Sequence, residues 1–350
     1  MKNLRWLLES GVADLARIPT KNAYLLHGSD LMLERLEQLK AYTIPVAGHD
    51  YAAKTPIMWN TVYEKLNLPL CNIMLIASPE RLSEVLGAFR EDARYLGGGI
   101  GVGLKEKVIP YLDRVVPNDL KSVNCIVKEG KELVGYNTDA WGFVQSLDEK
   151  LGEFHKQVKG SNIVVFGAGG VAKEVCRQLA ILGASYVAII NRTRQKAVSL
   201  AHELGSVYEH TEFIGVGEDL IRGVCCNTIK TPNAMINLTD KGSDGLLVDQ
   251  CAFAPSGEYN RKMALDDLRH IKALAPNAII ADITLPQGAW PITLQLAETA
   301  GFEKRQLLNG IPMVINQAGP AYIKIQQAHP DLHSKKLSQT QVLQIMRDSV

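Results

Sequence analysis

A strand, a glycine-rich loop and a helix follow one another near the middle of the chain, and this pattern constrains the fold more than any other feature. Residues 162–166 are apolar and rich in β-branched side chains, as in a strand buried on both faces. Apolar side chains then recur at three- and four-residue steps, the period of a helix, at Val171, Val175, Leu179 and Leu182. The loop that joins the two consists of Gly167, Ala168, Gly169, Gly170, Val171 and Ala172.

The small residues of this loop suit a dinucleotide. Gly167 permits a tight turn, Gly169 leaves room for the backbone to approach a pyrophosphate, and Ala172 allows the helix to pack closely on the strand. The free N–H groups at the start of the helix would point at the anion. A glycine turn can also join a strand to a helix without any ligand, but the flanking strand and helix favour dinucleotide binding.

A basic turn follows the second strand that we expect in this region, over 186–190. Asn191, Arg192 and Thr193 stand where NAD-binding units usually carry an acidic residue for the ribose hydroxyl, and Lys196 follows them. A carboxylate there would repel a 2′-phosphate, whereas a guanidinium can donate two charge-assisted hydrogen bonds to it. We therefore expect NADP rather than NAD as the cofactor; the alternative is a basic turn exposed to solvent.

The alternation of apolar segments with helix-like segments predicts an α/β fold of two domains. Residues 140–310 form the expected Rossmann-type, doubly wound NADP-binding domain, with strands over 162–166, 186–190, 223–227, 245–249 and 278–284. Residues 1–139 with 311–350 form the expected N-terminal α/β substrate-binding and catalytic domain. In that domain we predict a mostly parallel sheet, a helix over 79–95, a helical extension within the first forty residues, and helices from Gly310 onwards.

Charge and apolar content exclude several classes of partner. The 38 Lys and Arg residues nearly balance the 37 Asp and Glu residues, so a net charge of +1 favours neither nucleic acid nor an acidic membrane. No apolar run is long enough to span a membrane and no secretory signal is visible, so we expect a cytoplasmic protein, monomeric or homodimeric. The six cysteines lack zinc-ligand spacing, which predicts buried free thiols and no metal.

Four further segments accompany the glycine loop and the Asn-Arg-Thr turn. They are Gly101 to Lys107, Ser122 to Asn124, Gly135 to Asp139, and Asn309 to Gln317. With these motifs in this order, the chain resembles the shikimate dehydrogenase family, including its quinate-using members, from about Thr43 to about Ala328. The resemblance implies that Lys105 is catalytic with Asp139 as its partner, and that Asn124, Gln317 and Thr55 bind the substrate.

The resemblance also implies the reaction and its place in metabolism. It would be a reversible hydride transfer between NADPH and a cyclic keto or hydroxy acid such as 3-dehydroshikimate and shikimate, in the shikimate pathway of aromatic amino acid biosynthesis. The cofactor supplies the hydride chemistry, so the protein must supply a proton carrier. A Lys side chain has a pKa of roughly 10.4 and needs desolvation to exchange protons near neutrality, while a neighbouring carboxylate orients it.

The expected substrate pocket differs from the family pattern. Ala53 and Thr55 stand where the family has two serines that hold the substrate carboxylate, Gly101 replaces a substrate-binding Thr, and Leu285 replaces a Tyr. We expect the glycines between residues 97 and 103 to widen the wall near the catalytic lysine.

Residues 233–265 are a further difference, because they look like an insertion in the nucleotide-binding domain. These departures leave two alternatives open. One is a paralogue that acts on quinate or another cyclic alcohol, including one from secondary metabolism. The other is a regulator that binds NADP without efficient catalysis.

Overall fold

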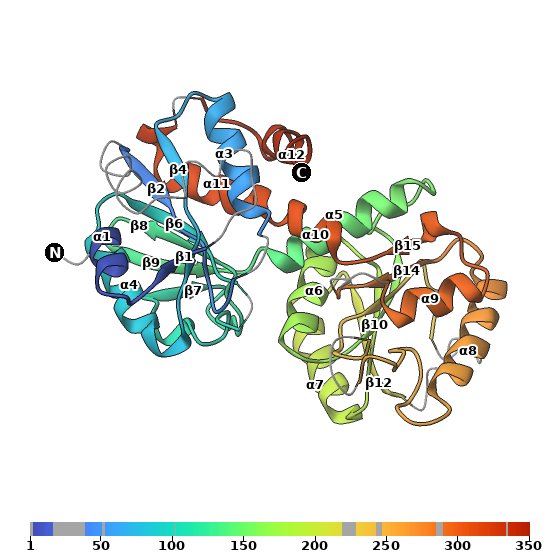
Figure 1. Ribbon diagram of the computed structural model, residues 1–350. Coiled ribbons are helices and arrows are strands. Elements are labelled where there is room, and N and C mark those ends of the chain that lie inside the picture. The colour runs from blue at the N-terminus through green and yellow to red at the C-terminus, as the bar shows by residue number, and fades with distance from the viewer. Residues whose placement is uncertain are drawn as a thin grey trace. The chain divides into compact units, whose positions relative to one another are not determined.

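The computed structural model describes residues 3–16, 39–50, 53–101, 103–218, 229–242, 247–284, 290–333 and 335–350. The chain divides into two compact units, Met1–Asp139 with Gln317–Val350, and Ala140–Asn316 (Figure 1). Both contain helices and strands, so the fold class is α/β, as the sequence predicts. The boundary that we expected at residue 310 lies before the end of the second unit, because helix α10 (Ile311–Asn316) belongs to that unit.

The second unit contains a six-stranded parallel sheet. Its strand order is β12-β11-β10-β13-β14-β15, and all neighbouring strands are parallel. Numbered along the chain, this is the 3-2-1-4-5-6 order of a Rossmann fold, in which ligands bind beyond the carboxyl ends of the strands. The strands are β10 (Asn162–Phe166), β11 (Tyr186–Asn191), β12 (Glu212–Gly217), β13 (Ala234–Asn237), β14 (Ile279–Asp282) and β15 (Leu307–Leu308).

Helices cover both faces of this sheet, because its strands are apolar on both sides. In β10, Ile163 and Val165 belong to one buried cluster, and Val164 and Phe166 belong to the other. This alternation follows from the two-residue period of a strand. The helices are α5 (Asp139–Gly152), α6 (Gly170–Ile181), α7 (Arg194–Gly205), α8 (Asn260–Leu274) and α9 (Ile292–Thr299).

Some expectations for this unit were wrong or remain outside the described residues. We expected a strand over 245–249, of which the structure describes residues 247–249. These residues form turns and no strand, and Val248 is 49% exposed. The strand expected over 223–227 lies outside the described residues. Three strands that we did not expect, β12, β13 and β15, are in the sheet; β13 is only four residues long and β15 only two, which leaves little apolar pattern to detect.

The first unit contains the mostly parallel sheet that we expected, with one of its six strands reversed. Its strand order is β4-β2-β6-β8-β9-β7, in which β8 is antiparallel to both β6 and β9. Strands β8 and β9 are joined by a tight hairpin at Gly130, whose φ is +65°, and so short a connection forces an antiparallel pair. The strands are β2 (Ala41–Thr43), β4 (Leu70–Asn72), β6 (Tyr95–Gly99), β7 (Arg114–Val116), β8 (Cys125–Glu129) and β9 (Glu132–Tyr136).

A smaller three-stranded sheet and several helices complete the first unit. The small sheet has the order β1-β5-β3, with β1 (Asp14–Leu15), β3 (Val46–Ala47) and β5 (Leu75–Ile76). The segment expected to be helical over 79–95 forms a short 3-10 turn and then helix α4, and β6 begins at Tyr95. The helices are α1 (Leu4–Glu9), α3 (Thr55–Lys65), α4 (Leu82–Glu91), α11 (Ala318–Ala328) and α12 (Gln339–Arg347).

The two ends of the chain follow the expectations as far as they are described. Residues 311–347 are mainly helical, with a short 3-10 turn at Pro330. At the N-terminus, α1 is helical, whereas most of the expected extension lies outside the described residues. Within the described ranges, no helix combines the length and the apolar character needed to cross a bilayer.

Candidate active site and dinucleotide pocket

Lys105 and Asp139 form an ion pair in the first unit. The distance from Lys105 Nζ to Asp139 Oδ2 is 2.5 Å, although 34 residues separate the two in sequence. The side chain of Lys105 is 29% exposed and that of Asp139 is 19% exposed. A pair that is mostly enclosed but open to solvent on one side can exchange a proton with a bound ligand.

Backbone contacts hold both residues in place. The carbonyl of Lys105 accepts a hydrogen bond from the N–H of Val123, at 2.8 Å. Asp139 is the first residue of α5, where the helix dipole favours a carboxylate. Its backbone N–H donates to Asn137 Oδ1, and the amide of Asn137 donates to the carbonyl of Ser122. The segments around Ser122 and Asp139 are therefore tied together beside the lysine.

Asn124 connects this pair to Gln317. Its Nδ2 lies 2.8 Å from Asp139 Oδ1, 3.0 Å from Thr138 Oγ1 and 3.2 Å from Gln317 Oε1. An amide NH₂ has only two hydrogens for these three acceptors. The Thr138 hydroxyl lies 3.1 Å from Gln317 Oε1, so Thr138 can donate to Gln317. Asn124 can then donate its two hydrogens to Asp139 Oδ1 and Thr138 Oγ1. The result is a continuous polar chain from Lys105 to Gln317.

Thr138 also belongs to this cluster, although we did not predict it. Its side chain is buried, and its backbone N–H also donates to Asn124 Oδ1 at 2.7 Å. The signal was present, because Thr138 directly precedes Asp139 within a motif that we had singled out.

Thr55 and the residues near it are less clearly placed. Thr55 is the first residue of α3, and Pro56 follows in the first helical turn, where it is well tolerated. Among the described residues, none of the hydrogen bonds that join the Lys105 cluster involves Thr55. Ala53 is buried. Leu285 lies outside the described residues.

The glycines before Lys105 are packed rather than open, which corrects our expectation of a widened wall. Gly98 lies in β6, where a Cβ atom would stand 2.0 Å from the carbonyl oxygen of Ile44. A Cβ atom on Gly97 would stand 2.4 Å from Ile126 O, and one on Gly101 would stand 2.8 Å from the Cβ of Ala47. Neighbouring strands thus occupy the space that side chains would need. Only Gly103, with a φ of +84°, has open space.

A pocket of about 350 Å³ lies in the second unit, at the carboxyl ends of the parallel strands. The glycine loop after β10 and the basic turn after β11 both line it. The cofactor candidates that line it are Gly167, Ala168, Gly169, Asn191, Arg192, Thr193 and Lys196. Segments after β12 and β13 complete the wall, including Glu218, Thr239 and Lys241.

The glycine loop fits a pyrophosphate. Gly167 has a φ of +120°, and a Cβ there would stand 2.9 Å from Leu238 O, so only glycine suits the turn. A Cβ on Gly169 would meet nothing within 4 Å, so the space in front of this residue is open for a ligand. Gly169 is also the N-cap of α6, whose first N–H groups are available to an anion.

Helix α6 packs differently from the expected pattern. Val171 is 44% exposed, although its spacing had placed it on the buried face. Ala172 is fully buried, as close packing of helix and strand requires. The buried face continues through Val175, Cys176 and Leu179. The exposed position of Val171 and of Gly170 before it leaves the first turn of the helix accessible.

The basic turn is exposed around the pocket. Arg192, Thr193 and Lys196 are exposed, and Asn191 Nδ2 donates to the carbonyl of Thr193 at 3.1 Å, which shapes the turn. A 2′-phosphate carries about 1.5 to 2 negative charges near neutral pH, so two cations at this edge suit it. The residues present therefore fit NADP.

The cysteines and other metal-binding side chains of the described ranges form no recognisable metal site. Cys71, Cys125, Cys176 and Cys251 are buried free thiols, and burial raises the pKa of each, to about 12 for Cys71 and Cys125 and about 11 for Cys251. A raised pKa leaves a thiol protonated and unreactive. Cys225 and Cys226 lie outside the described residues. In the part of the chain that the structure describes, no three His, Cys, Asp or Glu side chains group as metal ligands.

Comparisons with known proteins point to one family. A family model described as shikimate / quinate 5-dehydrogenase matches residues 149–220. The shikimate dehydrogenase (NADP(+)) of Halothermothrix orenii is 28% identical over 285 residues, which covers 80% of this chain and 89% of that protein. The shikimate dehydrogenase (NADP(+)) of Symbiobacterium thermophilum is 36% identical over 162 residues, which covers 45% of this chain and about half, 53%, of that protein.

Solved structures show the same fold. The shikimate 5-dehydrogenase of Listeria monocytogenes, solved in complex with shikimate and NAD, aligns with a TM-score of 0.63. The alignment covers 88% of this chain and 96% of that one, at 20% sequence identity. At this identity the likeness establishes the fold, a two-domain α/β architecture with a Rossmann-type domain.

Proposed function

We propose that this chain, which is similar to shikimate dehydrogenases over most of its length, is a member of that family and an NADP-dependent oxidoreductase that acts on a CH–OH group. The substrate pair would be a cyclic keto and hydroxy acid such as 3-dehydroshikimate and shikimate, in the shikimate pathway. One observation carries the proposal: Lys105 and Asp139 form an ion pair at 2.5 Å, and Asn124 connects this pair to Gln317.

Lys105 is the proposed proton carrier. In the direction of reduction its ammonium donates a proton to the carbonyl oxygen of the substrate, and in the direction of oxidation its amine accepts the proton of the hydroxyl. Asp139 holds the amine through Oδ2, which leaves the remaining Nζ hydrogens for the substrate. Bound NADPH would supply the hydride to the carbon of that carbonyl.

Asn124, Gln317 and Thr55 are the proposed substrate-binding residues. Asn124 is buried, and its hydrogen bonds with Asp139 and Thr138 fix its orientation before any ligand arrives. A preorganised polar cluster loses little freedom on binding and discriminates between substrates by their hydroxyl groups. Thr55 would add one hydroxyl from the start of α3.

The cofactor would bind in the pocket of the second unit. The open space at Gly169 and the exposed first turn of α6, with Gly170 and Val171, would receive the pyrophosphate. Ala168 and Ala172 let the loop and helix approach closely, and Asn191, Arg192, Thr193 and Lys196 would hold the 2′-phosphate end. We place this enzyme in the cytoplasm, as a monomer or homodimer without a nucleic-acid partner.

A spectrophotometric assay tests the proposal. The purified chain is given shikimate, quinate and other cyclic hydroxy acids with NADP⁺ or NAD⁺, and we expect turnover of shikimate with NADP⁺. Lys105→Met should lower kcat by about 10²- to 10⁴-fold, the usual contribution of a positioned acid–base. The affinity for NADP⁺ should stay within about twofold, because Lys105 and the dinucleotide pocket belong to different compact units.

Lys107→Met is the matched control, since Lys107 is exposed two residues further along the same loop. It should retain wild-type kcat. NADP⁺ binding without turnover of any cyclic hydroxy acid would contradict the enzyme and support an NADP-binding regulator.

A second candidate is a paralogue that acts on quinate or another cyclic alcohol. The observation that favours it is the wall of the expected substrate pocket. Ala53 is buried and offers no hydroxyl, and the backbone at Gly101 packs against Ala47, which leaves no room for a threonine side chain. A higher kcat/KM for quinate than for shikimate in the same assay would establish this candidate.

A further inference from the structure

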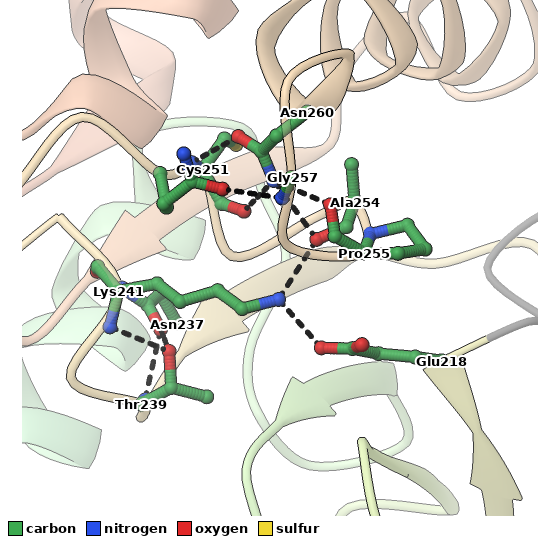
Figure 2. Close-up of polar contacts among 10 residues, drawn as sticks. Glu218, Asn237, Thr239, Lys241, Cys251, Ala254, Pro255, Gly257 and Asn260 are labelled. Atoms are coloured by element: carbon green, nitrogen blue, oxygen red, sulfur yellow. Dashed lines mark hydrogen bonds and ion pairs between the residues drawn. The ribbon is translucent and has the colours of Figure 1, made fainter. Parts of the chain in front are cut away.

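Lys241 and Glu218 form an enclosed ion pair in the wall of the dinucleotide pocket (Figure 2). The distance from Lys241 Nζ to Glu218 Oε1 is 2.5 Å. The side chain of Lys241 is 7% exposed and that of Glu218 is 16% exposed. Both residues line the pocket, so the pair lies at its surface and not in the interior of the unit.

The pair joins two segments that come from distant strands. Glu218 follows β12, and Lys241 follows β13. Strands β11 and β10 lie between these two in the sheet. Because the strands are parallel, all four carboxyl ends meet at one edge, and the glycine loop and basic turn start from the two middle strands. The ion pair therefore connects the segments on either side of the residues that we expect to bind the dinucleotide.

Hydrogen bonds hold Lys241 in position, and Figure 2 shows them. Its Nζ also donates to the carbonyl of Ala254 at 2.8 Å, and its own carbonyl accepts from Asn237 Nδ2 at 2.9 Å. Asn260 fixes the segment on the far side, because its Nδ2 lies within hydrogen-bond distance of the carbonyls of Cys251, Ala254 and Pro255 and can donate to two of them at a time. Lys241 is thus anchored at both its backbone and its ammonium.

The charged side chains that line the pocket indicate how this ion pair affects the binding of a dinucleotide. Three cations line it, Arg192, Lys196 and Lys241, against two carboxylates, Glu218 and Asp240. NADP carries about 1.5 to 2 more negative charges than NAD, from its 2′-phosphate. A carboxylate in the wall opposes that extra charge unless a cation lies directly beside it, and Lys241 is the cation bonded to Glu218.

We propose that Lys241 is a specificity-determining residue that neutralises Glu218 and thereby allows the pocket to accept NADP in preference to NAD. This role rests on the proposed function, since it requires a dinucleotide in this pocket. It also gives a purpose to part of the segment that looked like an insertion. That segment supplies both the lysine and the carbonyl of Ala254 that anchors it.

A double-mutant cycle on the full chain tests the proposal. Dissociation constants for NADP⁺ and NAD⁺ are measured for wild type, Lys241→Met, Glu218→Gln and the double variant. Lys241→Met should weaken NADP⁺ by about tenfold or more and NAD⁺ by less than about threefold, because Glu218 is left without its cation. The double variant should recover most of the preference for NADP⁺, since the carboxylate is gone as well.

Lys230→Met is the matched control. Lys230 forms an ion pair of 2.6 Å with Glu212, the first residue of β12 and therefore at its opposite end. Losing that pair should change neither dissociation constant. An equal loss of both dinucleotides in Lys241→Met, with no recovery in the double variant, would show that Lys241 serves only the structure of the wall and would overturn the proposal.

Lys241→Arg, together with the single variant Glu218→Gln from the cycle, keeps the test decisive if Lys241→Met does not fold. Lys241→Arg retains the cation and should keep the wild-type preference, and Glu218→Gln alone should increase the preference for NADP⁺; an unchanged preference in Glu218→Gln would contradict the proposal. Wild type that binds neither dinucleotide would instead refute the proposed cofactor. If wild type binds NADP⁺ and none of the variants changes the ratio of the two dissociation constants, only the role of Lys241 would be refuted.

Discussion

Two side chains that we propose to bind ligands, Asn124 and Arg192, differ in how firmly the protein fixes their orientation before a ligand binds. Asn124 is 5% exposed and lies within hydrogen-bond distance of three acceptors through one amide nitrogen. Its geometry is set before a ligand arrives. Arg192 is exposed on the turn after β11 and must lose side-chain freedom when it grips a phosphate. The buried amide thus determines position, whereas the exposed guanidinium contributes mainly charge.

Arg192→Asp tests that contribution at the scale of one residue. A carboxylate at this position would repel the 2′-phosphate and accept hydrogen bonds from the ribose hydroxyls of NAD. We expect the affinity for NADP⁺ to fall by about tenfold or more and the affinity for NAD⁺ to stay equal or rise. Isothermal titration with each dinucleotide measures the change, and an unaltered ratio would remove Arg192 from the phosphate site.

At the scale of an element, the space around a glycine decides whether its position requires glycine. In β6, Gly98 has no room for a Cβ, because the backbone of Ile44 approaches it. Gly215 in β12 is similar, since a Cβ there would stand 2.3 Å from the backbone of Ala197 in α7. Gly87 in α4 has open space around it. The same residue type is therefore required in the strands and dispensable in the helix.

This difference predicts opposite effects of alanine. Gly98→Ala should destabilise the first unit by about 2 kcal/mol or more, because a backbone oxygen 2.0 Å from the new Cβ cannot move aside without opening the sheet. Gly87→Ala is its control and should stabilise by about 0.5–1 kcal/mol, since alanine favours a helix interior. Urea-induced unfolding followed by circular dichroism measures both. Equal effects in the two variants would mean that the close approach to Ile44 is absent in solution.

At the scale of the whole molecule, the two units have their own cores, and the first unit contains two histidines whose protonation depends on pH near neutrality. The core of the second unit contains two apolar layers, one on each face of its parallel sheet. The first unit holds two histidines near its C-terminal helices, the half-buried His329 and the buried His333, and their burial lowers the pKa of each. A histidine of this kind favours the folded state only while it is neutral.

Acidification should therefore destabilise the first unit. The unfolded chain binds a proton on each histidine near pH 6.5, while the folded unit resists protonation until a lower pH. The contribution of these groups is complete above pH 6.5 and is lost as the pH falls towards their folded pKa values. We expect the Tm to drop between pH 7.5 and pH 5.0, and to drop less in the His329→Gln/His333→Gln variant. His202→Gln, on the exposed surface of α7, should behave as wild type.

Local pattern was enough for some elements and misleading for others. The strand, glycine loop and helix around Gly167 were predictable, because a run of β-branched residues and a helical period are both encoded within about ten residues. The apolar run at 245–249 was misread, because its leucine at 247 lines a pocket instead of a sheet. The reversed direction of β8 was not predicted, since it depends on a hairpin at Gly130 and not on the apolar content of the strand.

The amino-acid sequence by itself determined the α/β class, the Rossmann-type unit and the motifs that carry Lys105, Asp139 and the basic turn. Only the tertiary structure decided which of these residues meet. It placed Thr138 between Asn124 and Gln317, and it brought Lys241 to Glu218 across the ends of two intervening strands. The physical reason is range: periodicity and turn chemistry act between near neighbours, whereas burial and charge pairing depend on which distant segments the fold packs together.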